Sequence, residues 1–188
     1  MTLLENPLEI ALIHHPVYGK DGSIIKTSIT SFDLHDIART AKTYGVKRYW
    51  VVNPVPSQLW LARTIIEHWT SGVGAAYNPT RKEAIEIITL SSSLAEVCLT
   101  IESEVGIAPR LIGTSAKPHA KGLSYEQLKE EWRESKVPHV LLFGTGWGLA
   151  EEVLAQTNGR LIPLGEPEYN HLSVRAAVAI VLDRLCGR

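Results

Sequence analysis

Three segments of the sequence carry residue types suited to holding a small molecule, and each follows a predicted strand. They are residues 114–118, the glycine-rich loop Gly144–Gly148, and residues 165–171. Glycine has no side chain, so backbone amides in such loops can approach a ligand closely. Ligands of open α/β sheets bind beyond the carboxyl ends of the strands, which is where these segments are expected. They are therefore the first candidates for a binding site.

The glycine-rich loop has the pattern G-x-G-x-G, which is compatible with several ligands. A Walker A loop needs G-x-x-x-x-G-K-S/T, which the sequence lacks. A dinucleotide fingerprint stands near the first strand, whereas Gly144 lies in the last third of the chain. The common S-adenosylmethionine-binding fold places its glycine loop after the first strand and behind an acidic residue, which is missing here. A tight turn that requires small residues is the structural alternative.

Polar residues after Thr30 could move a proton or bind a phosphate. Arg39 can bind a phosphate through two parallel hydrogen bonds, and Asp33 or His35 could act as a base. Each also has a structural interpretation. Arg39 could be an exposed helix cation, Asp33 part of a helix cap with Thr30, and His35 a solvated residue at a helix start.

The remaining reactive and aromatic side chains are assigned mainly to structure. His14 and His15 have no partner at a metal-ligand spacing, so they are interpreted as structural or substrate-facing, and no metal site is expected. Cys98 falls on an apolar helix face. Trp147, inside the glycine-rich loop, is the aromatic residue to test as a ligand contact. The other tryptophans are interpreted as packing residues: Trp50, Trp60, Trp69 and Trp132.

Short apolar runs alternate with helical periodicity along the chain. Helix caps are expected at Thr30, Asn78, Ser93 and Ser124, and residues 17–29 read as an irregular loop. Strands are expected at residues 9–13, 48–52, 85–90, 110–113, 140–143 and 161–164. About six strands alternating with helices indicate an α/β fold with a mostly parallel sheet and helices on both faces. The length suits one domain, residues 1–188.

The last predicted helix, residues 172–185, has almost no polar side. A helix that is apolar on every side must be buried on every side. In a domain of this size one side meets the sheet, and we expect the other to meet a second copy of the chain. The sequence therefore predicts a homodimer through this helix.

Composition excludes several classes of protein. The 188 residues include 19 Lys and Arg, 20 Asp and Glu, 2 Cys and 45% hydrophobic residues, which excludes a disordered chain and a disulfide framework. With no signal sequence and no apolar run long enough to span a membrane, we expect a cytoplasmic protein. Residues 1–82 carry a net charge of +3 and the remainder −4. A polyanion would be drawn to the first part, although ordinary scatter of surface charge gives the same numbers.

Three motifs, in order along the chain, resemble one family. Residues 33–46 are similar to N-x-G-x-I-x-R-T-A-x-x-x-G-V, and residues 142–149 to F-G-x-E-G-x-G-L. Ile162-Pro163 with residues 171–177 is similar to I-P followed by N-V-S-V-A-A. The set resembles the SPOUT class of S-adenosylmethionine-dependent RNA methyltransferases. It is most similar to a compact subgroup that stands alone or is fused behind a tRNA (guanine-N1)-methyltransferase domain.

The resemblance implies a C-terminal trefoil knot, a dimer through the last helix, S-adenosylmethionine as cofactor and tRNA or rRNA as substrate. It also implies a possible association with a tRNA methyltransferase. Arg39 corresponds to an arginine that, in members acting on ribose 2′-hydroxyls, binds phosphate and helps to deprotonate the nucleophile; Asp33 and His35 are the other catalytic candidates. The residues implied around the cofactor are Thr114, Ser115, Phe143, Gly144, Thr145, Gly146, Trp147, Gly148, Ile162, Pro163, Leu164, Gly165, Tyr169, Asn170, His171, Leu172 and Ser173.

Departures from the family pattern keep two alternatives open. Asp33 and His171 stand where the motifs have Asn, the Glu of the second motif is missing, and its loop is one residue shorter. These differences suggest a module that binds the cofactor and holds RNA or a partner methyltransferase without transferring a methyl group. A third interpretation is a generic nucleotide-binding α/β protein.

Overall fold

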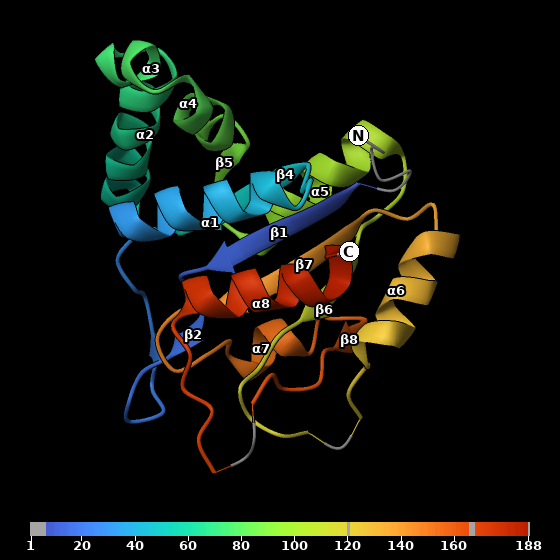
Figure 1. Cartoon of the computed structure of the whole chain (residues 1–188). Coiled ribbons are helices and arrows are strands. Elements are labelled where there is room, and N and C mark those ends of the chain that lie inside the picture. Colours follow the sequence, from blue (N-terminus) through green and yellow to red (C-terminus); the bar gives the residue numbers. More distant parts are fainter. Residues whose placement is uncertain (1–6, 120, 166–167, 188) are drawn as a thin grey trace.

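A parallel sheet forms the centre of the molecule (Figure 1). The computed structural model describes residues 7–119, 121–165 and 168–187. The strands of this sheet are β1 (Leu8–Ile13), β4 (Arg48–Val52), β5 (Ile88–Ser91), β6 (Arg110–Gly113), β7 (His139–Gly144) and β8 (Gly159–Arg160). Their order is β5-β4-β1-β7-β6-β8, and every pair is parallel. The predicted six-stranded parallel sheet is confirmed.

Helices cover both faces of the sheet, as predicted. On one face α1 (Ser31–Thr43), α6 (Tyr125–Glu134) and α8 (Val174–Cys186) pack on residues such as Leu12, Val51 and Leu141. On the other face α5 (Leu94–Val105) and the one-turn α7 (Glu151–Leu154) pack on residues such as Trp50 and Val140. The helices α2 (Pro56–Thr70), α3 (Val73–Tyr77) and α4 (Pro79–Ile85) extend beyond α1 at one side (Figure 1).

Strand β1 lies between β4 and β7, and all six of its residues are buried. A parallel strand covered by helices on both faces requires a nearly continuous apolar sequence, which LEIALI supplies except at Glu9. Because all six strands point the same way, their carboxyl ends reach one edge of the sheet. We call this edge the carboxyl edge.

The expected helix boundaries rest on local hydrogen bonds. Thr30, Ser93 and Ser124 each accept a bond from the backbone N–H three residues on, and Ser124 forms a full capping box with Gln127. Gly45 and Gly106 follow their helices with φ of +74° and +78°, a conformation that glycine adopts without strain. These predictions are confirmed.

Other boundaries differ from the prediction. The expected loop 17–29 contains a two-stranded antiparallel hairpin of β2 (Val17–Tyr18) and β3 (Ile24–Ile25). The strand expected at 161–164 is wrong: β8 lies two residues earlier, and only Leu161 continues the pairing, through a single bridge to Leu123. The strand expected at 85–90 begins at Ile88 because Ile85 ends α4.

Two further differences concern packing. Trp60 was expected to pack in the interior, but 68% of its surface is exposed. The last helix begins at Val174, two residues later than expected, and Ser173 caps it. The trefoil knot stays a prediction from the resemblance. Among the residues that the structure describes, no helix combines the length and apolar composition needed to cross a bilayer.

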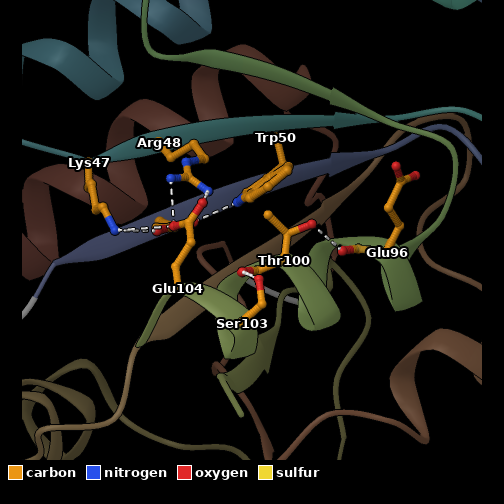
Figure 2. Close-up of polar contacts among 8 residues, drawn as sticks. Lys47, Arg48, Trp50, Glu96, Thr100, Ser103 and Glu104 are labelled. Atoms are coloured by element: carbon orange, nitrogen blue, oxygen red, sulfur yellow. Dashed lines mark hydrogen bonds and ion pairs between the residues drawn. The ribbon is translucent and has the colours of Figure 1, made fainter. Parts of the chain in front are cut away.

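The buried carboxylate of Glu9 lies at the amino ends of β1 and β4, away from the carboxyl edge. Its neighbours Lys47, Arg48 and Trp50 are shown in Figure 2. The Trp50 indole N–H donates to Glu9 Oε2 at 2.6 Å, and Lys47 Nζ lies 3.4 Å from Glu9 Oε1. Arg48 covers the Trp50 ring at 4.9 Å and forms two hydrogen bonds to Glu104. Burial of a charge requires such partners, so this network fixes β1 against β4 and α5.

The substitution Trp50→Phe tests the contribution of this network to stability. It keeps an aromatic ring and leaves Glu9 Oε2 without its donor, so we expect the free energy of unfolding to fall by about 1–3 kcal/mol. Urea unfolding measures the change. The control is Trp60→Phe, because Trp60 is exposed. Equal stability of the two variants would show that the Glu9–Trp50 bond contributes nothing.

Candidate functional site

The carboxyl edge brings together segments that are far apart in the sequence. The Thr145 backbone N–H donates to the Ile13 carbonyl at 3.2 Å, and the Thr114 hydroxyl donates to the Leu142 carbonyl at 2.8 Å. The loops that follow β1, β6 and β7 therefore begin side by side. This is the edge at which the sequence predicted the candidate binding segments.

The first and third of these segments are directly joined. The Asn170 side-chain amide donates to the Ala116 carbonyl at 3.1 Å. Just outside these two segments, Ile162 N–H donates to the Leu123 carbonyl at 3.0 Å. A cavity of about 240 Å³ lies between the third segment and α8. Its lining includes Leu164, Gly165, Tyr169, Asn170, His171 and Leu172, all of which were predicted, and also Ile180 and Arg184.

The glycine-rich loop is held by the β2–β3 hairpin. Tyr18 and the loop exchange two backbone hydrogen bonds of 2.9 Å: Trp147 N–H donates to the Tyr18 carbonyl, and Tyr18 N–H donates to Gly148. A Cβ on Gly146 would lie 2.8 Å from the Tyr18 carbonyl oxygen, and φ there is +59°. Turn geometry and contact with the hairpin therefore account for this glycine, which was the structural alternative raised from the sequence. Trp147 remains 52% exposed.

Tyr18 is a positioning residue that the sequence did not reveal. Its hydroxyl accepts a hydrogen bond of 3.1 Å from Glu151 N–H at the start of α7, and Lys117 Nζ lies 5.6 Å from the centre of its ring. The hairpin thus contacts two of the three candidate segments. A pair of two-residue strands has no recognisable periodicity, so only the fold reveals this role.

The three predicted catalytic residues do not share one face of α1. Asp33 faces α8: the Thr30 hydroxyl donates to it at 2.7 Å, and Arg175 Nε lies 3.6 Å away. Arg175 also donates to Asp36 at 2.8 Å. His35 instead contacts Trp69 of α2, with ring centres 5.3 Å apart, and Arg39 lines a cavity against α4. The structure therefore places Asp33 apart from His35 and Arg39, and the catalytic role of each stays a prediction.

The surroundings of His35 are electropositive. Burial is the largest cause of its lowered pKa, and the next is the positive charge of Arg81; Arg39 acts in the same direction and Asp36 against it. A histidine in this setting is neutral near pH 7. It faces α2, whereas Asp33 faces α8. Ser173 caps the start of α8, and His171 lines the cavity beside the third segment.

His14 directly follows β1 at the centre of the carboxyl edge and is fully buried. Its Nδ1 lies 3.0 Å from the Thr27 hydroxyl, which in turn contacts the Thr145 hydroxyl. Burial lowers the pKa of His14 to about 4, although the nearby Asp33 charge and backbone groups raise it. The side chain is therefore neutral at pH 7 and ties β1 to the loop that follows β7.

The family described as SAM-dependent RNA methyltransferase matches residues 7–187. This chain belongs to that family. It is an S-adenosylmethionine-dependent RNA methyltransferase, and S-adenosylmethionine is its cofactor. The resemblance inferred from the three motifs is confirmed.

Three relatives define the neighbourhood of this methyltransferase. An uncharacterised protein of Aquifex aeolicus is 41% identical over 180 residues, which cover 95% of this chain and 88% of the relative. A tRNA (guanine-N(1)-)-methyltransferase of Nitratidesulfovibrio vulgaris is 42% identical over 183 residues, and one of Oleidesulfovibrio alaskensis is 39% identical over 181. Both matches cover 96% of this chain but only 42% of the length of the relative.

Solved structures share the fold of the methyltransferase at lower identity. A putative methylase family protein from Neisseria gonorrhoeae has a TM-score of 0.66 at 16% identity, covering 98% of this chain and 84% of that one. A TrmH/SpoU tRNA modifying enzyme of A. aeolicus has a TM-score of 0.55 at 12% identity, covering 97% of this chain and 74% of that one. They support the same sheet and helix arrangement.

Acid should destabilise the protein through His14. Its pKa is lowered from 6.5 to about 4 on folding, so between these values the unfolded chain binds more protons and the free energy of unfolding falls as the pH falls. The complete effect is about 3 kcal/mol. His139 and His35, whose pKa values are also lowered, add to the slope.

Urea unfolding at several pH values, with the variant His14→Asn, isolates this contribution. Asparagine keeps a donor close to Thr27 and does not titrate, so the dependence of stability on pH should become shallower. His15→Asn is the control, because the adjacent ring is half-buried. An unchanged slope in His14→Asn would contradict the assignment.

Proposed function

We propose that this methyltransferase acts on tRNA, with its cofactor held by the three loops at the carboxyl edge. The observation that carries the proposal is the meeting of these loops at one edge: Asn170 joins the third segment to Ala116 of the first, and Tyr18 contacts both the first segment and the glycine-rich loop. The tRNA substrate is supported by the two relatives named as tRNA (guanine-N(1)-)-methyltransferases. The whole chain is proposed as one methyltransferase domain that works in the cytoplasm, where tRNA is modified.

The residues at the loops suit the parts of S-adenosylmethionine. Trp147, Ile162, Tyr169 and Leu172 are apolar side chains that are between 40% and 80% exposed, and they can cover an adenine ring. Backbone groups near Gly165, together with the polar side chains of the cavity, can bind the ribose and the amino-acid end. The cavity of about 240 Å³ is smaller than most complete ligand pockets, so it would take one part of the cofactor and the loop surfaces the rest.

The bound cofactor supplies an electrophilic methyl group on a sulfonium, which an RNA nucleophile attacks in line. The protein must hold the nucleophile in line and accept its proton. Asp33 is proposed as that acceptor. Its carboxylate lies 3.6 Å from Arg175, which stands at the start of α8, just beyond the third loop. Arg175 and the Thr30 hydroxyl fix the orientation of Asp33, and Asp36 holds the other end of Arg175.

Transfer of an isotopically labelled methyl group to unmodified tRNA transcripts tests this function. Nuclease digestion and mass spectrometry should find one methylated nucleoside. Asp33→Asn should reduce the rate about 100-fold or more while isothermal titration shows cofactor binding unchanged. Transfer to rRNA but not tRNA would contradict the proposed substrate.

A second candidate function is supported by one observation. Thr30 and Arg175 already engage both oxygens of Asp33, and Arg39 faces α4 rather than α8. A chain with its acid so engaged could bind cofactor and RNA, or a separate tRNA methyltransferase, without transferring a methyl group. Cofactor binding with no transfer to any RNA would favour this module.

The homodimer through α8 is supported by side chains that the single chain leaves partly uncovered. Val178, Val181 and Leu182 face the sheet, whereas Ala176 and Ile180, on the opposite side, are only half-buried. Sedimentation at micromolar concentration should show a dimer, and Ala176→Arg should convert it to a monomer. Ala155→Arg, on an exposed residue of another surface, is the control. A monomeric unmodified protein would contradict the dimer.

A further inference from the structure

A second cavity, of about 370 Å³, lies between α1 and α4. Arg39 and Lys42 reach it from α1, and Asn78 and Arg81 from the start of α4; Glu83 is the acidic residue in its lining. We call it the α1–α4 cavity. Among the residues that the structure describes, the loops at the carboxyl edge contribute none to its lining.

The three cations of the α1–α4 cavity are unpaired. Within residues 7–119, 121–165 and 168–187, no carboxylate oxygen lies within 4.0 Å of Arg39, Lys42 or Arg81. Their neighbour Lys82, by contrast, lies 3.7 Å from Glu86. Cations gathered in one cavity repel each other, and an anionic ligand would relieve that repulsion. The lowered pKa of His35 nearby agrees with a positive local potential.

The cavity also holds its donors in place. The Arg81 guanidinium carbon lies 4.6 Å from the centre of the Trp69 ring, so stacking fixes this side chain. Asn78 Oδ1 accepts hydrogen bonds from the backbone N–H of Arg81 at 3.0 Å and from the Thr80 hydroxyl at 2.9 Å. The side-chain amide nitrogen of Asn78 is left to donate to a ligand. Two guanidinium groups, one ammonium and one amide form a donor set that suits phosphate oxygens.

We propose that the α1–α4 cavity binds a phosphate of the RNA backbone, away from the site of methyl transfer. The proposal rests on the RNA-directed function. Phosphate contacts of this kind position a nucleic acid without reading its sequence. Arg39 then acts as a substrate-binding residue, and α1 presents Asp33 and Arg39 to two different parts of one RNA.

Anisotropy of a labelled, unmodified tRNA transcript, titrated with the full chain at several salt concentrations, tests the proposal. Lys42→Ala and Arg81→Gln should each weaken binding several-fold and reduce the slope of log K against log salt by about 0.7–0.9. Lys42 is exposed, so its variant should fold normally. Lys82→Ala is the matched control, because Lys82 stands next to Arg81 on α4 and does not line the cavity. Isothermal titration with inorganic phosphate alone should show no comparable binding.

The outcomes separate this proposal from the proposed function. Binding that is equally strong in Lys42→Ala, Arg81→Gln and Lys82→Ala, in a chain that methylates tRNA, overturns the cavity proposal alone. Tight phosphate binding lost in Lys42→Ala, with RNA binding unchanged, identifies a free-anion site and also overturns it. RNA binding that depends on Lys42 and Arg81 without methyl transfer supports the cavity proposal and overturns the proposed activity. A chain that binds no RNA contradicts both.

Discussion

The common direction of six strands is the constraint on which the rest of the structure depends. Because β1 is central and pairs in parallel with both β4 and β7, the chain after every strand emerges at one edge. Segments separated by more than a hundred residues meet there, as the contact between Thr27 and Thr145 shows. The fully buried His14 lies at this junction and stays neutral, so the edge is held by hydrogen bonds rather than by charge.

Helix α1 connects the two proposed sites because its two sides face different neighbours. The side toward α8 places Asp33 next to Arg175, directly after the third loop. The side toward α4 places Arg39 and Lys42 in the cationic cavity. Three of the cations that give the first 82 residues their positive net charge, Arg39, Lys42 and Arg81, therefore lie together in this cavity. A nearly neutral chain can still contact RNA through a local group of unpaired cations, with binding that depends strongly on salt.

The sequence predicted what depends on nearby residues and missed what depends on packing. Helix caps such as Thr30 and Ser124 act within three residues, so their patterns are visible in the chain. The strand expected at 161–164 is apolar, yet β8 is formed by Gly159 and Arg160, because its register is set by pairing with β6. The roles of Tyr18 and Arg81 depend on a hairpin and a helix brought from elsewhere in the chain.

Amide hydrogen exchange with and without S-adenosylmethionine can show whether the cofactor binds across the three loops at the carboxyl edge. Exchange should become slower in residues 114–118, 144–148 and 162–172 and stay unchanged in α4. Protection confined to α1 and α4, or to the amino ends of the strands around Glu9, would contradict binding across these loops.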